Sequence, residues 1–181
     1  MRRKIMLATG LVVIVLAGIY MFVGSSEKKE STEIETQSMK QMVHDFSVRN
    51  TVAESASITS KQLTVTDDDP TKSVTYDLPK DEFFLSIAPY VEKTHPCATH
   101  SLTGCQGEMV EEDFNVSIVD LDGNSIMDKT LMKSQPNGFI DLWLPRDKTY
   151  RITIEHDGKI AESEVSTFES DDTCLTTMQL H

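Results

Sequence analysis

Repeated Asp-Gly and Asn-Gly turns divide the C-terminal part of the chain into short segments of alternating polar and apolar residues. Turns of this kind lie at Asp122-Gly123, Asn137-Gly138 and Asp157-Gly158. Both dipeptides are typical of tight hairpin connections, because they tolerate the positive φ angles that such turns require. Alternation with a period of two places one side of each strand in a core. The pattern predicts an antiparallel β-sandwich for this part of the chain.

One helix and one hairpin are expected before this β-rich region. Ser38 suits the cap of a helix. The apolar residues after it have the i, i+3, i+4, i+7 spacing of one helical face: Met39, Met42, Val43 and Phe46. Residues 62–66 and 73–76 alternate apolar and polar side chains on either side of the turn-forming stretch 67–70. This arrangement predicts a β-hairpin.

A strongly apolar run, residues 82–91, follows the hairpin and predicts a buried strand. Pro89 cannot donate a backbone hydrogen bond, which favours the edge of a sheet or a bulge for this strand. The expected fold class is therefore α+β. A short N-terminal helix and β-hairpin over residues 38–80 are followed by a mainly antiparallel β-sandwich-like domain over residues 81–181.

The first 37 residues are expected to lie outside the folded part. A basic N-terminus precedes an uncharged, mostly apolar run of 20 residues, 5–24, which is about the length that spans a bilayer as a helix. Residues 1–24 are therefore predicted to be a signal peptide or a membrane anchor, and residues 25–37 a polar linker. Both alternatives place the rest of the chain outside the cytoplasm, in the periplasm or on the outer face of the membrane. Membrane contact is expected only through residues 5–24.

The charge of the chain excludes one class of partner. The sequence has 29 acidic and 17 basic residues, a formal net charge of −12, and all acidic residues follow the apolar run. A surface of this sign repels nucleic acid and attracts cations, so nucleic-acid binding is not expected. No Ser-His-Asp order, phosphate-binding loop or dinucleotide fingerprint is evident, so no catalytic residue is predicted.

Two cysteines and two histidines crowd into eleven residues, from His95 to Cys105. They are His95, Cys97, His100 and Cys105. The third cysteine of the chain, Cys174, lies far away in the sequence. Outside the cytoplasm thiols tend to oxidise, and three cysteines cannot all pair within one chain. At least one thiol is therefore left without a disulfide partner within the chain, and a reactive or metal-bound thiol is one explanation.

Several chemistries fit these residues. Side chains at i and i+2 of an extended segment point the same way, so His95 and Cys97 can face one site. Three thiolates suit Cu(I), and three thiolates with one histidine suit tetrahedral Zn(II). A disulfide beside a free thiol suits thiol–disulfide exchange. A single structural disulfide with an inert third cysteine also fits, and the residues alone leave these alternatives open.

Several segments resemble the CueP family of periplasmic copper-binding proteins, and the resemblance covers roughly residues 81–180. They are Phe83-Phe84-Leu85-Ser86-Ile87-Ala88-Pro89-Tyr90-Val91, Thr94-His95-Pro96-Cys97, His100-Ser101-Leu102-Thr103-Gly104-Cys105-Gln106-Gly107-Glu108, Asn137-Gly138-Phe139, Leu142-Trp143-Leu144-Pro145-Arg146-Asp147 and Asp172-Thr173-Cys174-Leu175-Thr176-Thr177. The resemblance implies copper binding in the cell envelope in the service of copper tolerance. It also implies that Cys97, Cys105 and Cys174 are the family's three cysteines, with His95 and His100 as nearby candidate ligands.

We therefore predict an extracytoplasmic protein that holds Cu(I) with three cysteine thiolates and nearby histidines, for copper tolerance, buffering or delivery. Zinc is the second candidate ion. The candidate partners beyond copper are a copper-exporting pump and a copper-requiring envelope enzyme, and no oligomeric state is predicted. The alternative function is a thiol oxidoreductase or metal reductase that uses the same cysteines, although a binding protein is favoured over an enzyme.

Overall fold

The computed structural model describes residues 35–69 and 71–181. The expected signal peptide or anchor, residues 1–24, lies outside the described residues, as do residues 25–34 of the expected linker. Within the described part of the chain, no helix is both long and apolar enough to cross a membrane.

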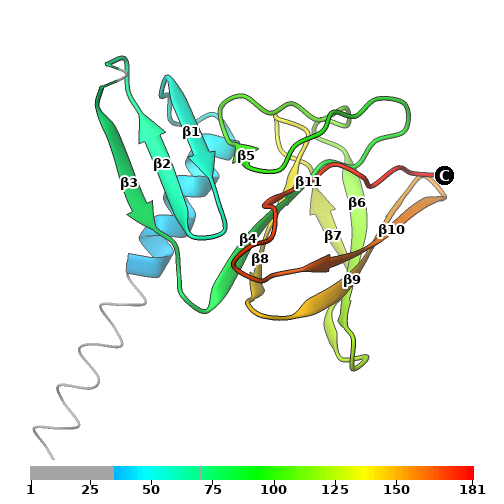
Figure 1. Ribbon diagram of the computed structural model, residues 1–181. Helices are drawn as coiled ribbons and strands as arrows, with labels where there is room; N and C mark the ends of the chain where they lie inside the picture. The colour runs from blue at the N-terminus through cyan, green and yellow to red at the C-terminus, as the bar shows by residue number, and fades with distance from the viewer. Residues whose placement is uncertain (1–34, 70) are drawn as a thin grey trace, which may run out of the picture. The chain divides into compact units, whose positions relative to one another are not determined.

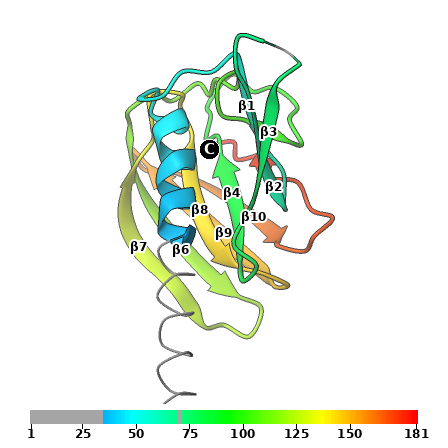
Figure 2. The same ribbon diagram turned by 90° about the vertical axis from the view of Figure 1, so that its left-hand side faces the viewer.

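A helix is described over residues 35–47, and Val43, Phe46 and Ser47 on it are buried. The expected helix is thus confirmed, but the prediction that Ser38 caps it is wrong, because the helix already includes the three residues before Ser38. Glu and Gln favour helical backbone, so the end of the expected linker is helical instead. The last turns of this helix lie beside strand β8, residues Ile140–Pro145 (Figure 2).

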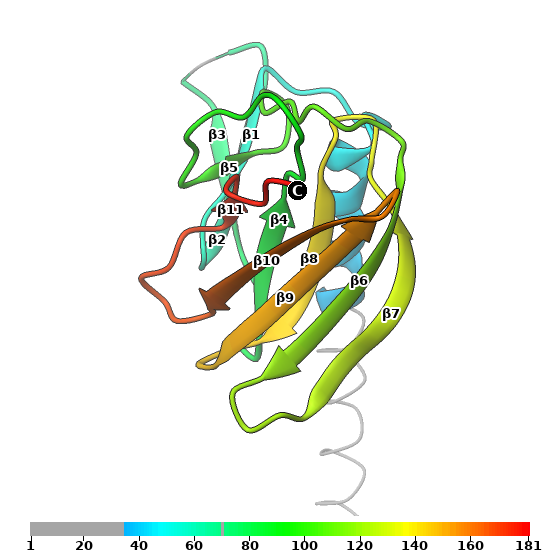
Figure 3. The same ribbon diagram turned by 90° about the vertical axis from the view of Figure 1, so that its right-hand side faces the viewer.

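Eleven strands are described, and they form three sheets (Figures 1 and 3). The first sheet has the strand order β3-β2-β1-β5, the second β10-β9-β6-β7 and the third β11-β4-β8. Besides β8, the strands are β1 (Ser55–Ile58), β2 (Gln62–Thr66), β3 (Ser73–Asp77), β4 (Glu82–Ile87), β5 (His100–Ser101), β6 (Asp113–Asp120), β7 (Ser125–Lys133), β9 (Thr149–His156), β10 (Lys159–Ser166) and β11 (Cys174–Leu175). Among these strands, only the pairing of β11 with β4 is parallel.

The turn pattern predicted most of this connectivity. The expected hairpin is β2–β3, and the two Asp-Gly turns join β6 to β7 and β9 to β10 as antiparallel neighbours. The Asn137-Gly138 turn is different, because β7 before it and β8 after it belong to different sheets. This turn carries the chain from one sheet to the other and does not form a hairpin. The predicted mainly antiparallel fold is nevertheless confirmed by the other pairings.

The second and third sheets share one hydrophobic core. Strands from both sheets contribute the buried side chains Phe83, Leu85, Ile87, Phe114, Val116, Ile118, Leu142, Leu144, Ile152 and Ile154. Burial of such side chains is the main favourable contribution to folding. The mostly β, antiparallel architecture is confirmed, whereas the sandwich assignment itself stays a prediction.

Strand β4 is the middle strand of its sheet, between β11 and β8, and is buried at every residue except the half-buried first one. The prediction that Pro89 places this strand at an edge is wrong, because the strand ends at Ile87, before the proline. Successive side chains point to opposite faces of a sheet. Alternate residues of β4 therefore enter the hydrophobic core, and the others, including Ser86, face away from it.

Two glycines bring the loop after Cys105 against the turn before β8. The N–H of Gly107 donates to the carbonyl of Asn137 at 2.7 Å. A Cβ at Gly138 would lie 2.8 Å from backbone atoms of Gly107, and Gly138 also has a φ of +80°. Both the φ angle and the close approach therefore require glycine at this position.

Comparison of Gly138→Ala with Gly158→Ala tests the close approach. Gly158 has a similar φ of +76°, but an added Cβ there meets no atom within 4 Å. Gly158→Ala is expected to lower the free energy of unfolding by about 1–2 kcal/mol, through backbone strain alone. Gly138→Ala is expected to cost about 1–3 kcal/mol more, because the backbone must also move. Urea unfolding measures both, and equal losses would show that the two loops are not in contact.

Candidate metal centre

Four potential metal ligands converge: Cys97, His100, Cys105 and Cys174. Their ligand atoms all lie within 4.8 Å of one another. The two sulfurs of Cys97 and Cys105 are 3.5 Å apart, and Cys174 Sγ lies 3.5 Å from His100 Nδ1. His100 and Cys174 are buried, and the other two are half-buried. The fold thus assembles all three cysteines with one of the two predicted histidines.

His100 is held in place by the short strand β5, which joins the first sheet through the pairing of His100 with Ile58 on β1. The N–H of His100 donates to Thr173 Oγ1 at 3.1 Å, and the Thr173 hydroxyl donates to the carbonyl of Ile58 at 2.7 Å. Thr173 is fully buried and directly precedes β11. A single hydroxyl therefore ties the start of β11 to both β1 and β5.

Cys174 reaches the site through the parallel pairing of β11 with β4, in which it lies opposite Ser86. The two strands lie side by side in Figure 1. The N–H groups of Thr173 and Cys174 also donate to the carbonyl of Ala98, at 3.0 and 3.2 Å. These bonds join the last strand to the loop that carries Cys97.

Cys105 is placed by a tight turn after β5. Its N–H donates to the carbonyl of Ser101 at 3.0 Å, and the N–H of Ser101 donates to Cys105 Sγ at 3.4 Å. A Cβ at Gly104 would lie 2.8 Å from the Ser101 hydroxyl, so a larger residue there would force that hydroxyl to move. The turn brings Cys105 back to Cys97.

His95 lies outside the group of four. Its half-buried ring faces Phe139 edge-on, with ring centroids 6.3 Å apart. A hydrogen bond from His95 favours the thiolate of Cys105, so His95 approaches the site from one side. Phe139 also lies against the ring of His100, at 4.5 Å between centroids. His95 therefore contacts Cys105 but does not belong to the group of four mutually close ligand atoms.

The negative charge of the metal-free site concentrates on Cys105. A hydrogen bond from Cys174, helped by the N–H of Ser101, holds the pKa of Cys105 well below its usual range. The same hydrogen bond, together with burial, raises the pKa of Cys174. Burial also raises the pKa of Cys97. At neutral pH the site therefore holds one thiolate and two thiols.

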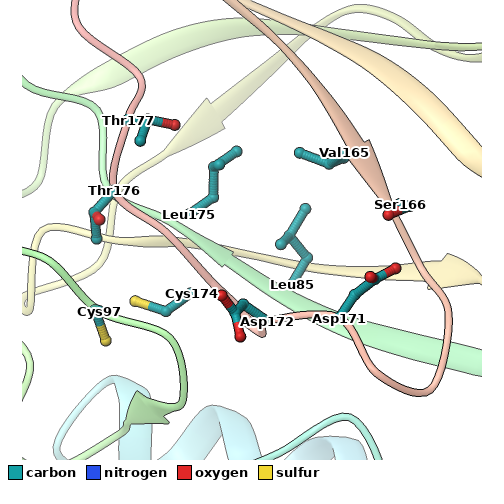
Figure 4. A pocket seen from close by; sticks show the side chains of 10 residues that line it. All are labelled: Leu85, Cys97, Val165, Ser166, Asp171, Asp172, Cys174, Leu175, Thr176 and Thr177. Atoms are coloured by element: carbon teal, nitrogen blue, oxygen red, sulfur yellow. The ribbon is translucent and has the colours of Figure 1, made fainter.

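A pocket of about 280 Å³ opens beside Cys97 and Cys174 (Figure 4). Its wall includes Asp171 and Asp172. Asp171 accepts a hydrogen bond from the N–H of Phe168 at 2.7 Å, whereas the charge of Asp172 adds to the effect of burial in raising the pKa of Cys97. A cation that approaches the sulfurs from this side passes a negatively charged wall.

The donor set fits a soft metal ion. A tetrahedral site with metal–sulfur bonds of about 2.3 Å has its ligand atoms roughly 3.7 Å apart. The two measured separations of 3.5 Å are close to that value. All four donor atoms lie within 4.8 Å of one another, so any longer separation must close by no more than about 1 Å for the four atoms to bind one ion. Three sulfurs and one imidazole nitrogen are ligands that both Cu(I) and Zn(II) accept.

Sequence reasoning missed the polar residues behind His100. Ser86 and Asp141 lie in apolar strands, β4 and β8, and Ser86 is fully buried. A polar side chain inside an otherwise apolar strand is a signal that could have singled them out, since buried polar groups need partners. Which partners they have depends on strand pairing, and that is not visible in the sequence.

Comparison with known proteins gives one family. The family described as periplasmic copper-binding protein CueP matches residues 27–179. The chain is also similar to a solved structure, the crystal structure of S. CueP, with 38% sequence identity and a TM-score of 0.73. That similarity covers 79% of this chain and 88% of the solved one. No curated protein matches the chain.

The charge distribution predicts the order in which the thiols react. In the reduced, metal-free protein, iodoacetamide is expected to alkylate Cys105 first and the buried Cys174 last, because the thiolate is the nucleophile. The rate at Cys105 should stay nearly constant between pH 8 and pH 6, since its pKa is lowered. An ordinary thiol, with a pKa of about 8.5, slows roughly tenfold per pH unit over the lower part of this range. Mass spectrometry of the labelled peptides measures the order, and first labelling at Cys97 would contradict it.

Glu108 holds the loop that leads into the site. Its carboxylate accepts hydrogen bonds from three consecutive N–H groups, of Val91 at 3.0 Å, Glu92 at 3.0 Å and Lys93 at 2.8 Å. These bonds, the one from Lys93 first, lower the pKa of Glu108. The carboxylate thus anchors the backbone just before His95.

Glu108→Gln is expected to lower the melting temperature at pH 7, because an amide accepts these hydrogen bonds less well than a carboxylate. The folded-state pKa is the lowered one, so the stabilisation is present above the ordinary carboxyl pKa and is lost as the pH falls through the folded value. The difference between wild type and variant should therefore shrink below about pH 4. Glu112→Gln, at an exposed position, is the charge-matched control. A pH-independent difference would rule out this role of the carboxylate.

Proposed function

This chain belongs to the CueP family of periplasmic copper-binding proteins, and we propose that it holds one Cu(I) ion with the thiolates of Cys97, Cys105 and Cys174. The observation that carries the proposal is the convergence of these sulfurs and His100 Nδ1 within 4.8 Å. Thiolate ligands select Cu(I) over harder ions. Such a site would buffer copper or deliver it in the cell envelope, and so serve copper tolerance.

The three cysteines start from different protonation states, which suggests how the site fills. Cys105 offers a thiolate before any metal arrives, because its pKa is lowered. Cys97 lines the pocket and is half-exposed, and Cys174 lines the same pocket but is buried. Both have raised pKa values, so each loses its proton only when a metal replaces it. Binding at neutral pH should therefore release about two protons per chain.

Residues 1–24 would direct the chain to the cell envelope, as a signal peptide or as an anchor. The partners we propose are a copper-exporting pump that supplies the ion, or a copper-requiring envelope enzyme that receives it. Mass spectrometry of the mature N-terminus distinguishes cleavage from anchoring.

A thiol oxidoreductase or metal reductase is the second candidate function. The supporting observation is that the sulfurs of Cys97 and Cys105 are 3.5 Å apart, so a modest movement would allow a disulfide bond of about 2.05 Å. That bond would remove two of the three sulfur ligands. Disulfide formation and copper binding would therefore compete for the same two atoms.

An anaerobic Cu(I) titration of reduced residues 26–181 against a chromogenic chelator tests the proposal. One Cu(I) per chain is expected, with all three thiols protected from alkylation when the ion is bound. Replacing any one of the three cysteines by Ser should weaken Cu(I) binding by about 100-fold or more, since loss of a supporting residue alone costs 10–100-fold. His44→Gln, at an exposed histidine of the helix, should leave the affinity unchanged.

Two other outcomes would favour the competing functions. Tight Zn(II) binding that Cu(I) does not displace would replace copper by zinc as the bound ion. Absence of Cu(I) binding, with a disulfide between Cys97 and Cys105 that re-forms quickly and turns over with a reductant, would favour the redox enzyme.

A further inference from the structure

A row of polar side chains lies behind the candidate metal centre, on the face of β4 that is turned away from the hydrophobic core. Ser86 pairs with Cys174 on β11 and with Asp141 on β8, so these three residues form one row across the third sheet. His100 Nε2 lies 3.3 Å from Ser86 Oγ. The row therefore connects a thiol ligand, a hydroxyl and a carboxylate directly behind the imidazole.

The directions of the hydrogen bonds in this row are determined by the chemistry of its members. The Ser86 hydroxyl donates to Asp141 Oδ1 at 2.6 Å, and the Ser47 hydroxyl donates to Asp141 Oδ2 at 2.6 Å. A hydroxyl has one hydrogen, so Ser86 Oγ can only accept from His100. This hydrogen bond favours the tautomer of the neutral imidazole with the proton on Nε2 and the lone pair on Nδ1.

That lone pair faces the sulfurs. His100 Nδ1 lies 3.5 Å from Cys174 Sγ and belongs to the group of four ligand atoms. His100, Ser86 and Ser47 are all fully buried, so water does not compete for these hydrogen bonds. In the opposite tautomer, Nε2 and Ser86 Oγ would both be acceptors with no hydrogen between them. Two buried acceptors in contact are unfavourable.

We propose that Ser86 and Asp141 are positioning residues that hold His100 as the Nε2–H tautomer and thereby make it, and not His95, the imidazole ligand of the site. The ligand part of this inference rests on the proposed function, whereas the tautomer part concerns the metal-free protein. Metal-bound histidines usually donate their second N–H to such a partner, which fixes the ring and the tautomer. His95 has no hydrogen bond to a carboxylate or hydroxyl among the described residues, and its ring rests on Phe139.

Ser47 extends the row to the helix over residues 35–47. Its hydroxyl occupies the second oxygen of the Asp141 carboxylate, so the carboxylate is held at both oxygens. Loss of the Ser47 hydroxyl leaves the bond from Ser86 in place. Ser47→Ala should therefore have a smaller effect than Ser86→Ala on the state of His100.

Long-range ¹H–¹⁵N NMR of the histidine rings in the reduced, metal-free protein tests the tautomer directly. The wild type is expected to show His100 with a protonated Nε2 and an unprotonated Nδ1. Ser86→Ala and Asp141→Asn should each shift the balance toward the other tautomer, while Ser86→Thr, which keeps a hydroxyl, should restore the wild-type state. Asp128→Asn, an exposed carboxylate on β7, is the charge-matched control and should change nothing.

Addition of Cu(I) to the same samples tests the ligand assignment. The ¹⁵N signal of His100 Nδ1 is expected to move strongly, and the signals of His95 to stay nearly unchanged. Asp141→Asn and Ser86→Ala should each weaken Cu(I) binding by about 10–100-fold, with far-ultraviolet circular dichroism confirming that the variants fold. Since Ser86→Thr keeps the hydroxyl, it should bind Cu(I) more tightly than Ser86→Ala.

The outcomes separate the two proposals. The positioning role of Ser86 and Asp141 is overturned if His100 Nδ1 is protonated in the wild type. It is also overturned if neither Ser86→Ala nor Asp141→Asn changes the tautomer ratio of His100. A Cu(I)-induced shift at His95 instead of His100 overturns the ligand assignment. If the wild type binds no Cu(I), the proposed function and the ligand assignment fail, but the metal-free spectra still decide whether Ser86 and Asp141 fix the tautomer.

Discussion

Burial of strand β4 on both faces is the constraint on which the core and the candidate metal centre both depend. Alternate residues of the strand enter the hydrophobic core, and the residues between them point to the opposite face, where Ser86 lies against the site. The strand has a neighbour on each side, so Cys174 and Asp141 are both placed opposite Ser86. A buried serine is tolerated there because its hydroxyl is hydrogen-bonded. Strand pairing in the core thereby fixes the positions of Cys174 and Asp141 relative to Ser86.

The metal-free site carries little charge. Three thiolates within hydrogen-bonding distance would repel one another in a poorly solvated place. The site avoids this by keeping the charge on Cys105, where the thiol of Cys174 and the N–H of Ser101 stabilise it. A bound metal cation would stabilise the thiolates of Cys97 and Cys174 as well, so these two thiols would lose their protons. The same residues therefore suit both an empty and a filled state.

The periodicity of the sequence was enough to predict the helix, the β2–β3 hairpin and most later strands, because those signals are local. It failed at Pro89, where the strand ends before the proline, and at β5, where two residues are too few to show a period. It also missed Ser86 and Asp141, although each is a polar residue in an apolar strand. Their role depends on which strands lie side by side, and strand order is set by the packing of the whole core.

The sequence by itself determined the chemistry that is available: three thiols, histidines close to two of them, an acidic chain and a mostly antiparallel β fold. Only the tertiary structure decided that Cys174 reaches the window of residues 95–105, that His100 joins the sulfurs while His95 stays outside, and that a carboxylate stands behind the imidazole. The physical reason is that residue types and their spacing act over a few positions. The meeting of groups more than seventy residues apart depends instead on the parallel pairing of β11 with β4 and the antiparallel pairing of β5 with β1.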